Sequence, residues 1–165
     1  MERNLWGNLE GLMDGVKNPK EIFEEQADYL KEHFDGLVGC SVLAFDLRKE
    51  WIDYYSDLGV ESNFSYSFGL YSDYVARYSY EICTFAYGIK MYPMAISFGT
   101  DITKELKIKF FMKNISIVES EDTIVVEDEG QFLEALQEIL SSNGVRQVLK
   151  GLLAIAKSEA QELPF

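Results

Sequence analysis

Apolar side chains recur on every second residue in the middle of the chain, where Phe64, Tyr66, Phe68 and Leu70 alternate with serine and glycine. A period of two places all four side chains on one face of an extended strand, facing the core together. The alternation returns in residues 74–87 and again in residues 90–98. Residues 60–98 therefore predict three antiparallel strands joined by turns, and residues 54–98 hold nine of the ten tyrosines.

Other segments predict further strands. Residues 37–47 are apolar on both parities, which indicates a central strand buried on two sides. Residues 115–118 and 123–126 flank an acidic turn and predict a hairpin. Pro93 has no N–H to donate, so we expect the strand around it to be an edge strand or to carry a bulge.

Helical spacing is found at both ends of the chain. Asn18-Pro19 predicts the start of a helix that runs to Gly36. Residues 5–16 also have apolar residues at helical spacing and predict a first, poor helix. Its three glycines four apart would let another backbone approach closely, but they indicate a frayed or broken helix at least as strongly. Asp128 with Gln131 resembles a capping box. It opens the first of two C-terminal helices, which we expect to form an antiparallel pair on one face of the sheet.

Two segments are harder to interpret. Residues 48–59 are charged and end in a turn-like Asp57-Leu58-Gly59. Trp51 in this segment, with Tyr54 and Tyr55, either anchors it to the core or forms an exposed aromatic contact. In residues 99–113, Asp101 suits the cap of a short helical turn, whereas the later residues alternate as a strand would.

These patterns predict a single α+β domain over residues 1–165. Its centre is an antiparallel, aromatic-rich β-sheet of about five or six strands, packed with two N-terminal and two C-terminal helices. The length suits one domain with a sizeable core. No apolar run approaches the roughly 20 residues that span a bilayer. The first residues lack the features of a signal peptide, so we expect a cytoplasmic protein.

The net charge is −13, and it is unevenly distributed. Residues 1–36 sum to −5 and residues 115–165 to −7, whereas residues 54–98 carry only −2. A field of this sign repels phosphate backbones and anionic lipid, which disfavours nucleic acid and membrane surfaces as partners. It favours a basic protein partner, although solubility alone also explains an acidic surface.

Recognisable catalytic patterns are missing from the sequence. It contains no phosphate-binding glycine loop and no nucleophile elbow, and a relay through histidine would have to use His33. Cys40 and Cys83 lie in strand-like runs and predict buried, reduced thiols. We expect no metal and no cofactor, because the cysteine and histidine count is too low for zinc and the acidic clusters lack calcium-loop spacing. A hydrolase that uses two carboxylates stays open, since their separation in space is not visible in a sequence.

The composition leaves two hypotheses from different classes. The first is a non-enzymatic protein-interaction module, of the inhibitor or immunity type, that captures a basic partner. The second is a small-ligand-binding protein with a pocket between the aromatic sheet and the helices. For the first we expect acidic residues to steer the partner and tyrosines near the ends of the sheet to contact it: Glu24, Glu25, Glu127, Glu129, Tyr54, Tyr55, Tyr71 and Tyr74.

Overall fold

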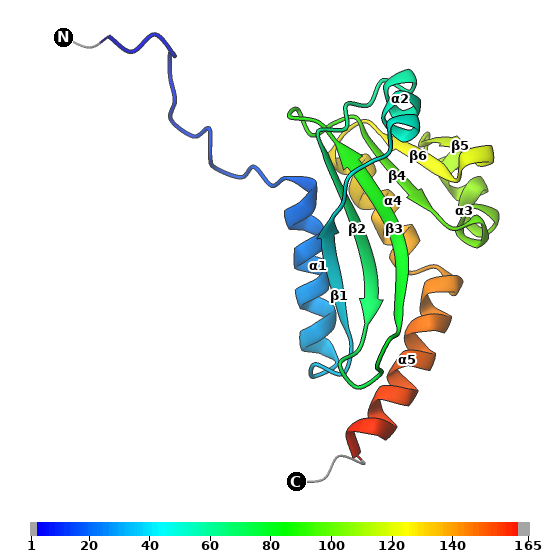
Figure 1. Ribbon diagram of the computed structural model, residues 1–165. Helices are drawn as coiled ribbons and strands as arrows, with labels where there is room; N and C mark the ends of the chain where they lie inside the picture. Colours follow the sequence, from blue (N-terminus) through cyan, green and yellow to red (C-terminus); the bar gives the residue numbers. More distant parts are fainter. Residues whose placement is uncertain (1–2, 162–165) are drawn as a thin grey trace.

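The aromatic block forms the middle of a six-stranded antiparallel sheet in the computed structural model, which describes residues 3–161 (Figure 1). The order of the strands is β1-β2-β3-β4-β6-β5. Their bounds are β1 Gly39–Ala44, β2 Phe64–Tyr71, β3 Ser79–Tyr87, β4 Met94–Phe98, β5 Ser116–Val118 and β6 Thr123–Val126. The predicted α+β class and the predicted antiparallel, aromatic-rich sheet are confirmed.

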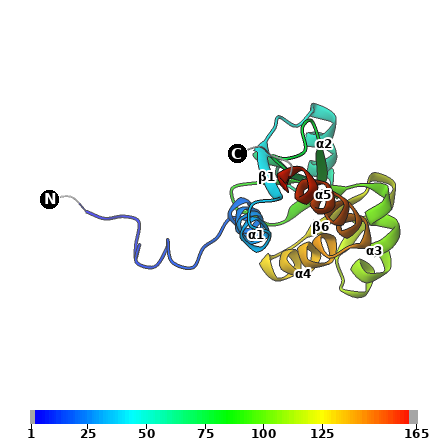
Figure 2. The ribbon, with the colours of Figure 1, turned by 90° about the horizontal axis from the view of Figure 1, so that it is seen from below.

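Five helices cover the two faces of this sheet unequally. Their bounds are α1 Pro19–His33, α2 Lys49–Asp57, α3 Thr100–Met112, α4 Glu129–Leu140 and α5 Asn143–Gln161. Helices α1, α3, α4 and α5 contribute to the main core on one face, which we call the core face. Helix α2 packs alone on the opposite face, which we call the outer face (Figure 2).

The alternation in β2 divides these faces as predicted. Phe68 and Leu70 are buried on the core face, and Tyr66 is half-buried there. Phe64 lies at the rim and is 38% exposed, so the prediction that all four residues are core residues is too broad. One extra residue, Ile82, interrupts the β2–β3 ladder as a bulge, which allows both Ile82 and Cys83 to be buried.

Gly69 sits opposite this bulge and has to be glycine. A Cβ atom there would lie 2.8 Å from the carbonyl oxygen of Tyr80. The close approach of the two backbones therefore depends on the missing side chain.

The start and end signals of α1 are confirmed in detail. The side chain of Asn18 accepts a hydrogen bond from the backbone N–H of Glu21 at 3.0 Å, and Pro19 occupies the first turn. At the other end the N–H of Gly36 donates to the carbonyl of Lys31 at 2.9 Å, with Gly36 in the left-handed conformation at φ +78°. Asp128 caps α4 in the same way: its side-chain carboxylate accepts a hydrogen bond from the backbone N–H of Gln131 at 2.8 Å.

The first predicted helix does not form. Residues 3–18 are an arm that extends away from the body (Figure 1), and Gly7, Gly11 and Gly15 have φ values of +79°, +78° and +69°. A right-handed helix excludes such values, and the arm has no packing partner in the described structure that would offset the cost of glycine.

Two helices appear where the sequence did not predict them. Helix α2 replaces the expected charged break, because Trp51, Tyr55 and Leu58 follow helical spacing and pack on the outer face. Helix α3 replaces the expected short turn and strand, since Ile102, Leu106 and Phe110 form its buried stripe. In both helices, charged residues between the apolar ones obscured the helical spacing of the apolar residues in the sequence.

Strand positions account for the other corrections. β1 is an edge strand and not central, because its second face, including Leu43, remains exposed. β4 is an interior strand, because Pro93 precedes its first residue and removes no ladder bond. The hairpin of β5 and β6 is confirmed. Helices α4 and α5 share the core face but splay apart after a short turn, and do not run antiparallel (Figures 1 and 2).

Candidate interaction surface

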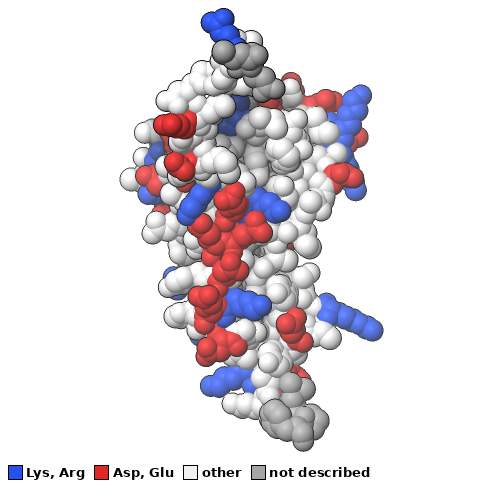
Figure 3. Space-filling model, turned by 90° about the vertical axis from the view of Figure 1, so that its left-hand side faces the viewer, with Lys and Arg blue, Asp and Glu red and all other residues white. Residues whose placement is uncertain are grey.

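A column of carboxylates runs along the solvent side of α1. Its members Glu21, Glu24, Glu25, Asp28 and Glu32 are all exposed. Ile22 and Phe23 point the other way, into the core, which fixes the acidic side of the helix outward. Figure 3 shows the carboxylates gathered down one side of the molecule. We call this set the acidic stripe.

Few cations neutralise the acidic stripe. Lys17 Nζ lies 2.7 Å from the carboxylate of Glu25, and the other ion pair within residues 3–161 joins Lys109 to Glu138 elsewhere on the surface. Lys20 does not pair with a carboxylate, because its ammonium lies over the ring of Tyr66, 5.4 Å from the centroid. The stripe therefore presents net negative charge to the solvent.

Glu129, the first residue of α4, lies near the start of α1, and Glu127 precedes it by two residues. The two helices meet in the core, where the ring centroids of Phe23 and Phe132 are 5.4 Å apart. The pKa of Lys17 is raised by its hydrogen bond to Glu25 and by that carboxylate's charge, with smaller contributions from Glu129 and Glu21. The fold thus brings Glu25 and Glu129, two of the predicted acidic residues from opposite ends of the chain, close to the same lysine.

The four predicted contact tyrosines do not form one patch. Tyr54 and Tyr55 are on α2, while Tyr71 and Tyr74 lie at the opposite end of β2 (Figure 1). Tyr71 packs over Gly39, where a Cβ atom would come within 2.9 Å of the tyrosine ring. Tyr74 follows in the turn, where its N–H donates to the Ser72 hydroxyl.

Tyr55 offers no surface to a partner. It is 2% exposed, and its hydroxyl is 2.7 Å from Ser97 Oγ, which in turn lies 2.8 Å from Thr123 Oγ1. Tyr54 is half-buried beside Trp51, and its hydroxyl is buried with no hydrogen-bond partner. Of the two interpretations of these aromatic residues, anchoring describes both: they attach α2 to the outer face.

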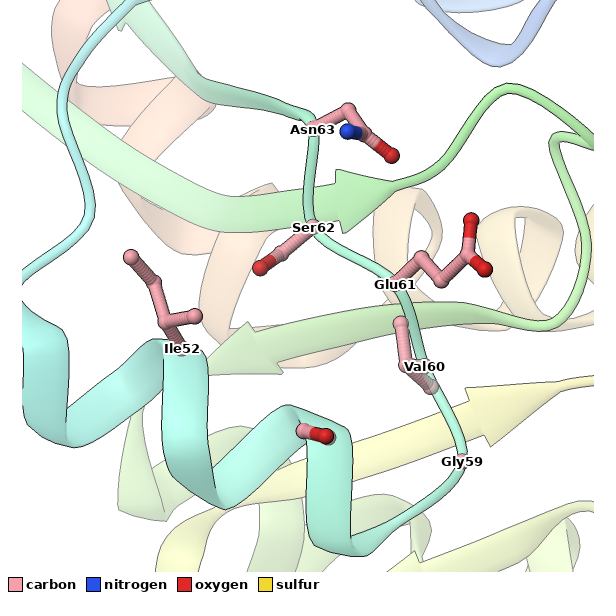
Figure 4. Close-up of a pocket in the computed structure, with 7 residues that line it drawn as sticks. Ile52, Gly59, Val60, Glu61, Ser62 and Asn63 are labelled. Carbon is pink, nitrogen blue, oxygen red and sulfur yellow. The ribbon is translucent and has the colours of Figure 1, made fainter.

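A broad, open hollow lies between α2 and the loop that leads into β2 (Figure 4). It encloses about 640 Å³ and is lined by Ile52, Ser56, Gly59, Val60, Glu61, Ser62 and Asn63. In Figure 4, Ser62 points toward the α2 side, whereas Glu61 and Asn63 point to the opposite side of the loop. The polar groups do not converge on one point, as they would have to do to bind and activate a substrate.

A narrower groove lies between the sheet and the helices, at the place where the ligand-binding hypothesis requires a pocket. It holds about 160 Å³ and is lined mainly by apolar side chains of α1, α5 and the core face, among them Leu30, Phe68 and Leu149. Ligand pockets are typically of the order of 300–1,000 Å³. The groove is therefore small for an organic ligand.

The two thiols and the histidine are poorly placed for chemistry. Burial raises the pKa of Cys40 from 9.0 to about 12 and raises that of the buried Cys83 as well. Both thiols stay protonated at neutral pH, and a protonated thiol is a weak nucleophile. His33 is exposed, and its ring packs against Tyr29 and Phe34.

Two surfaces were missed by the sequence-based reasoning. One is the arm of residues 3–18, whose apolar side chains are exposed. They are Leu5, Trp6, Leu9, Leu12, Met13 and Val16. The other is the free edge of β1. The spacing of the glycines is the sequence signal that could have indicated the arm. The free edge of β1 depends on the order of the strands, which no local sequence pattern encodes.

Over residues 3–161, no group of three or more histidine, cysteine, aspartate or glutamate residues is arranged to hold a metal ion. No helix in the same range is long and apolar enough to cross a membrane. Comparisons of the chain with protein-family models, curated proteins and solved structures each return no match. The case for a function therefore depends on the surfaces described above.

Proposed function

We infer that this protein is a non-enzymatic interaction module that captures a basic partner protein through the acidic stripe. The observation that carries the proposal is the largely unpaired column of carboxylates on α1, and the nearby charge of Glu129 supports it. A chain with a net charge of −13 attracts a positively charged partner over several ångströms before contact.

Charge of this kind acts mainly on the rate of association. Complementary potentials steer a partner into register and accelerate encounter, while buried contacts govern dissociation. Among the predicted contact residues, Tyr71 and Tyr74 remain candidates for such contacts, because both are partly exposed at the end of β2. An inhibitor or immunity protein that neutralises a basic protein would use this combination.

The second candidate function, binding of a small ligand, has one observation in its favour. The apolar groove beside Leu30 and Phe68 lies between sheet and helices, where that hypothesis expects a pocket. Its volume of about 160 Å³ and its mainly apolar lining, with Gln26 and Tyr29 as the side chains able to orient a ligand by hydrogen bonds, make it the weaker candidate.

We also propose that the protein works in the cytoplasm and that nucleic acid is not its partner. Two free thiols, Cys40 and Cys83, support a reducing compartment. The negative field of the acidic stripe supports the exclusion of phosphate backbones.

The test compares two double variants that change the net charge equally. Glu24→Lys with Glu129→Lys alters the acidic surface, and Glu50→Lys with Glu159→Lys alters exposed carboxylates on α2 and α5. Proteins captured at low salt by the immobilised wild type provide the partner, whose association rate is then measured by stopped flow.

We expect the first double variant to slow association by about tenfold and to weaken its dependence on salt. The second double variant should associate at nearly the wild-type rate. Equal rates for both variants would show that the acidic stripe does not steer a partner, and the proposal would then fail.

A further inference from the structure

The backbone of β1 exposes a regular row of hydrogen-bonding groups. The N–H of Phe45 donates to the carbonyl of Ser65, the residue opposite it, at 3.2 Å. In an antiparallel ladder such bonded pairs alternate with non-bonded ones. Ser41 and Leu43 therefore bond to β2, whereas Cys40, Val42 and Ala44 point their N–H and C=O groups away from the sheet.

These outward groups have no partner in residues 3–161. No backbone or side-chain bond from outside the sheet reaches Cys40, Val42 or Ala44. Ala44 is exposed and the other two residues are half-buried. Three donors and three acceptors at a spacing of two residues are what an added strand requires.

The two edges of the sheet differ in how they are protected. Protein edges are usually blocked by charged residues, proline, a bulge or a very short strand. β5 is three residues long and runs into the acidic turn of Glu119, Glu121 and Asp122. β1 is six residues long and contains no charged residue and no proline. Only β1 is therefore suited to accept another strand.

Apolar side chains flank the same edge on the outer face. Leu43 is 62% exposed, and Phe45, just beyond the end of β1, is 37% exposed. An added strand would place its own side chains against them. Unpaired backbone groups and exposed apolar side chains thus lie together at the edge of β1.

The charge next to the edge determines which strand fits. Lys20 lies over Tyr66, the residue opposite Ala44, and this contact fixes which flank of α1 faces β1. Glu24 and Asp28 follow at helical spacing, and so does Lys31. The five carboxylates of the acidic stripe outnumber Lys20 and Lys31, and the stripe is on the side of the molecule where β1 ends the sheet (Figures 1 and 3). A strand with Lys or Arg side chains complements this flank.

A second copy of the chain fits less well. Antiparallel pairing of two β1 strands about a two-fold axis would put both α1 helices on the same side of the joined sheet, next to each other. Their acidic stripes would then face one another, and such like-charge contact opposes association.

We propose that the free edge of β1 binds an extended basic segment of the partner protein, which adds to the sheet as a seventh strand. The proposal rests on the function inferred above and names its contact surface: backbone bonds to Cys40, Val42 and Ala44, apolar contact with Leu43, and charge pairing with Glu24 and Asp28. The tyrosines are not required for this contact.

The test uses synthetic peptides and the full chain. The probe is a capped peptide of alternating lysine and valine, and its control replaces each lysine with glutamate. On the protein, Val42→Pro removes an outward N–H without removing a ladder bond to β2, and Val42→Thr keeps that N–H in a side chain of similar shape. Affinity is measured by fluorescence anisotropy at two salt concentrations, and amide exchange is measured residue by residue by NMR.

We expect the basic peptide to slow exchange at the Cys40, Val42 and Ala44 amides, while the amides of Ser41 and Leu43 are already protected in the free protein. Val42→Pro should weaken binding by about tenfold relative to Val42→Thr. The acidic peptide should bind about tenfold more weakly than the basic one at low salt.

The outcomes separate this proposal from the one on which it rests. Salt-sensitive binding of the basic peptide without protection of β1, or with equal affinity for both Val42 variants, overturns strand addition and leaves steering by the acidic stripe intact. If the basic and the acidic peptide slow amide exchange in β1 equally, strand addition stands and the proposal that the partner is basic is overturned instead. Protection in the free protein together with a dimer in sedimentation shows that a second copy is the occupant. Absence of binding by either peptide also overturns strand addition.

Discussion

The core face and the outer face of the sheet are built by the same strands but are packed very differently. On the core face the ring of Phe23 stacks on Phe85 at 3.9 Å between centroids and contacts Phe68 at 4.9 Å. On the outer face, β1 and β2 present serines such as Ser41, Ser65 and Ser67, and α2 covers only a small cluster around Tyr55.

The difference shows how one chain separates stability from binding. A strand alternates its side chains between the two faces, so its apolar residues can fill the core while small polar residues leave the other face open. Four helices complete the core face. The outer face near β1 stays uncovered, and there the edge backbone and Leu43 remain accessible.

The largest expected effect comes from removing a buried ring at the centre of the core face. Phe68→Ala should lower the free energy of unfolding by about 3–5 kcal/mol, because it removes a buried ring and leaves a cavity next to Phe23. Urea denaturation of the purified variant measures this loss.

The matched control is the neighbouring residue on the other face. Ser67 is partly exposed and bonds only to the exposed Glu81 carboxylate at 2.9 Å, so Ser67→Ala should cost less than about 0.5 kcal/mol. Similar losses for the two variants would contradict the assignment of the faces.

The second expected effect uses the two thiols, of half-buried Cys40 and buried Cys83, as probes of the core face at high pH. The pKa of Cys40 rises from 9.0 to about 12 on folding, because the interior disfavours the thiolate. Above pH 9 the unfolded chain releases a proton that the folded chain retains, so stability falls as pH rises toward 12.

The expected loss is about 1.4 kcal/mol per pH unit for such a thiol. Urea melts between pH 8 and pH 10.5 should show a decline, and the decline should be shallower in Cys40→Ala. Stability that stays constant over this range, or fast thiol labelling of the native protein at pH 8, would mean that the thiols are accessible to solvent.

The smallest expected effect concerns the part of the outer face that α2 covers. Tyr55→Phe removes the hydrogen bond to Ser97 and should cost about 1 kcal/mol. Tyr54→Phe removes a buried hydroxyl that has no partner, so thermal unfolding should show no loss, or a small gain in stability. A larger loss for Tyr54→Phe than for Tyr55→Phe would show that the Tyr54 hydroxyl makes a stabilising hydrogen bond, and would contradict this assignment.

Much of the fold follows from local sequence signals. Asn18-Pro19, Gly36 and the pair Asp128–Gln131 predicted helix ends that the structure confirms. The alternation in β2 correctly indicated which side chains face the core. These signals work because capping, backbone conformation and side-chain period depend on residues within a few positions of each other.

The candidate site was only partly visible in the same way. The acidic character of α1 is plain in the sequence, but its proximity to Glu129 depends on the packing of Phe23 against Phe132. Tyr55 illustrates the opposite error: its composition-based assignment to a contact surface fails because tertiary packing buries it. Helix α2 was missed because its apolar stripe is short and is stabilised by the outer face.

By itself the sequence determined the α+β class, the antiparallel aromatic strands, the inner side of β2 and the acidic side of α1. Only the tertiary structure decided that β1 lies at the edge, that β4 is interior and that the arm of residues 3–18 is not a helix. The physical reason is range. Periods and caps are local interactions, whereas strand order, the free edge of β1 and the burial of Tyr55 arise from contacts between residues far apart in the chain.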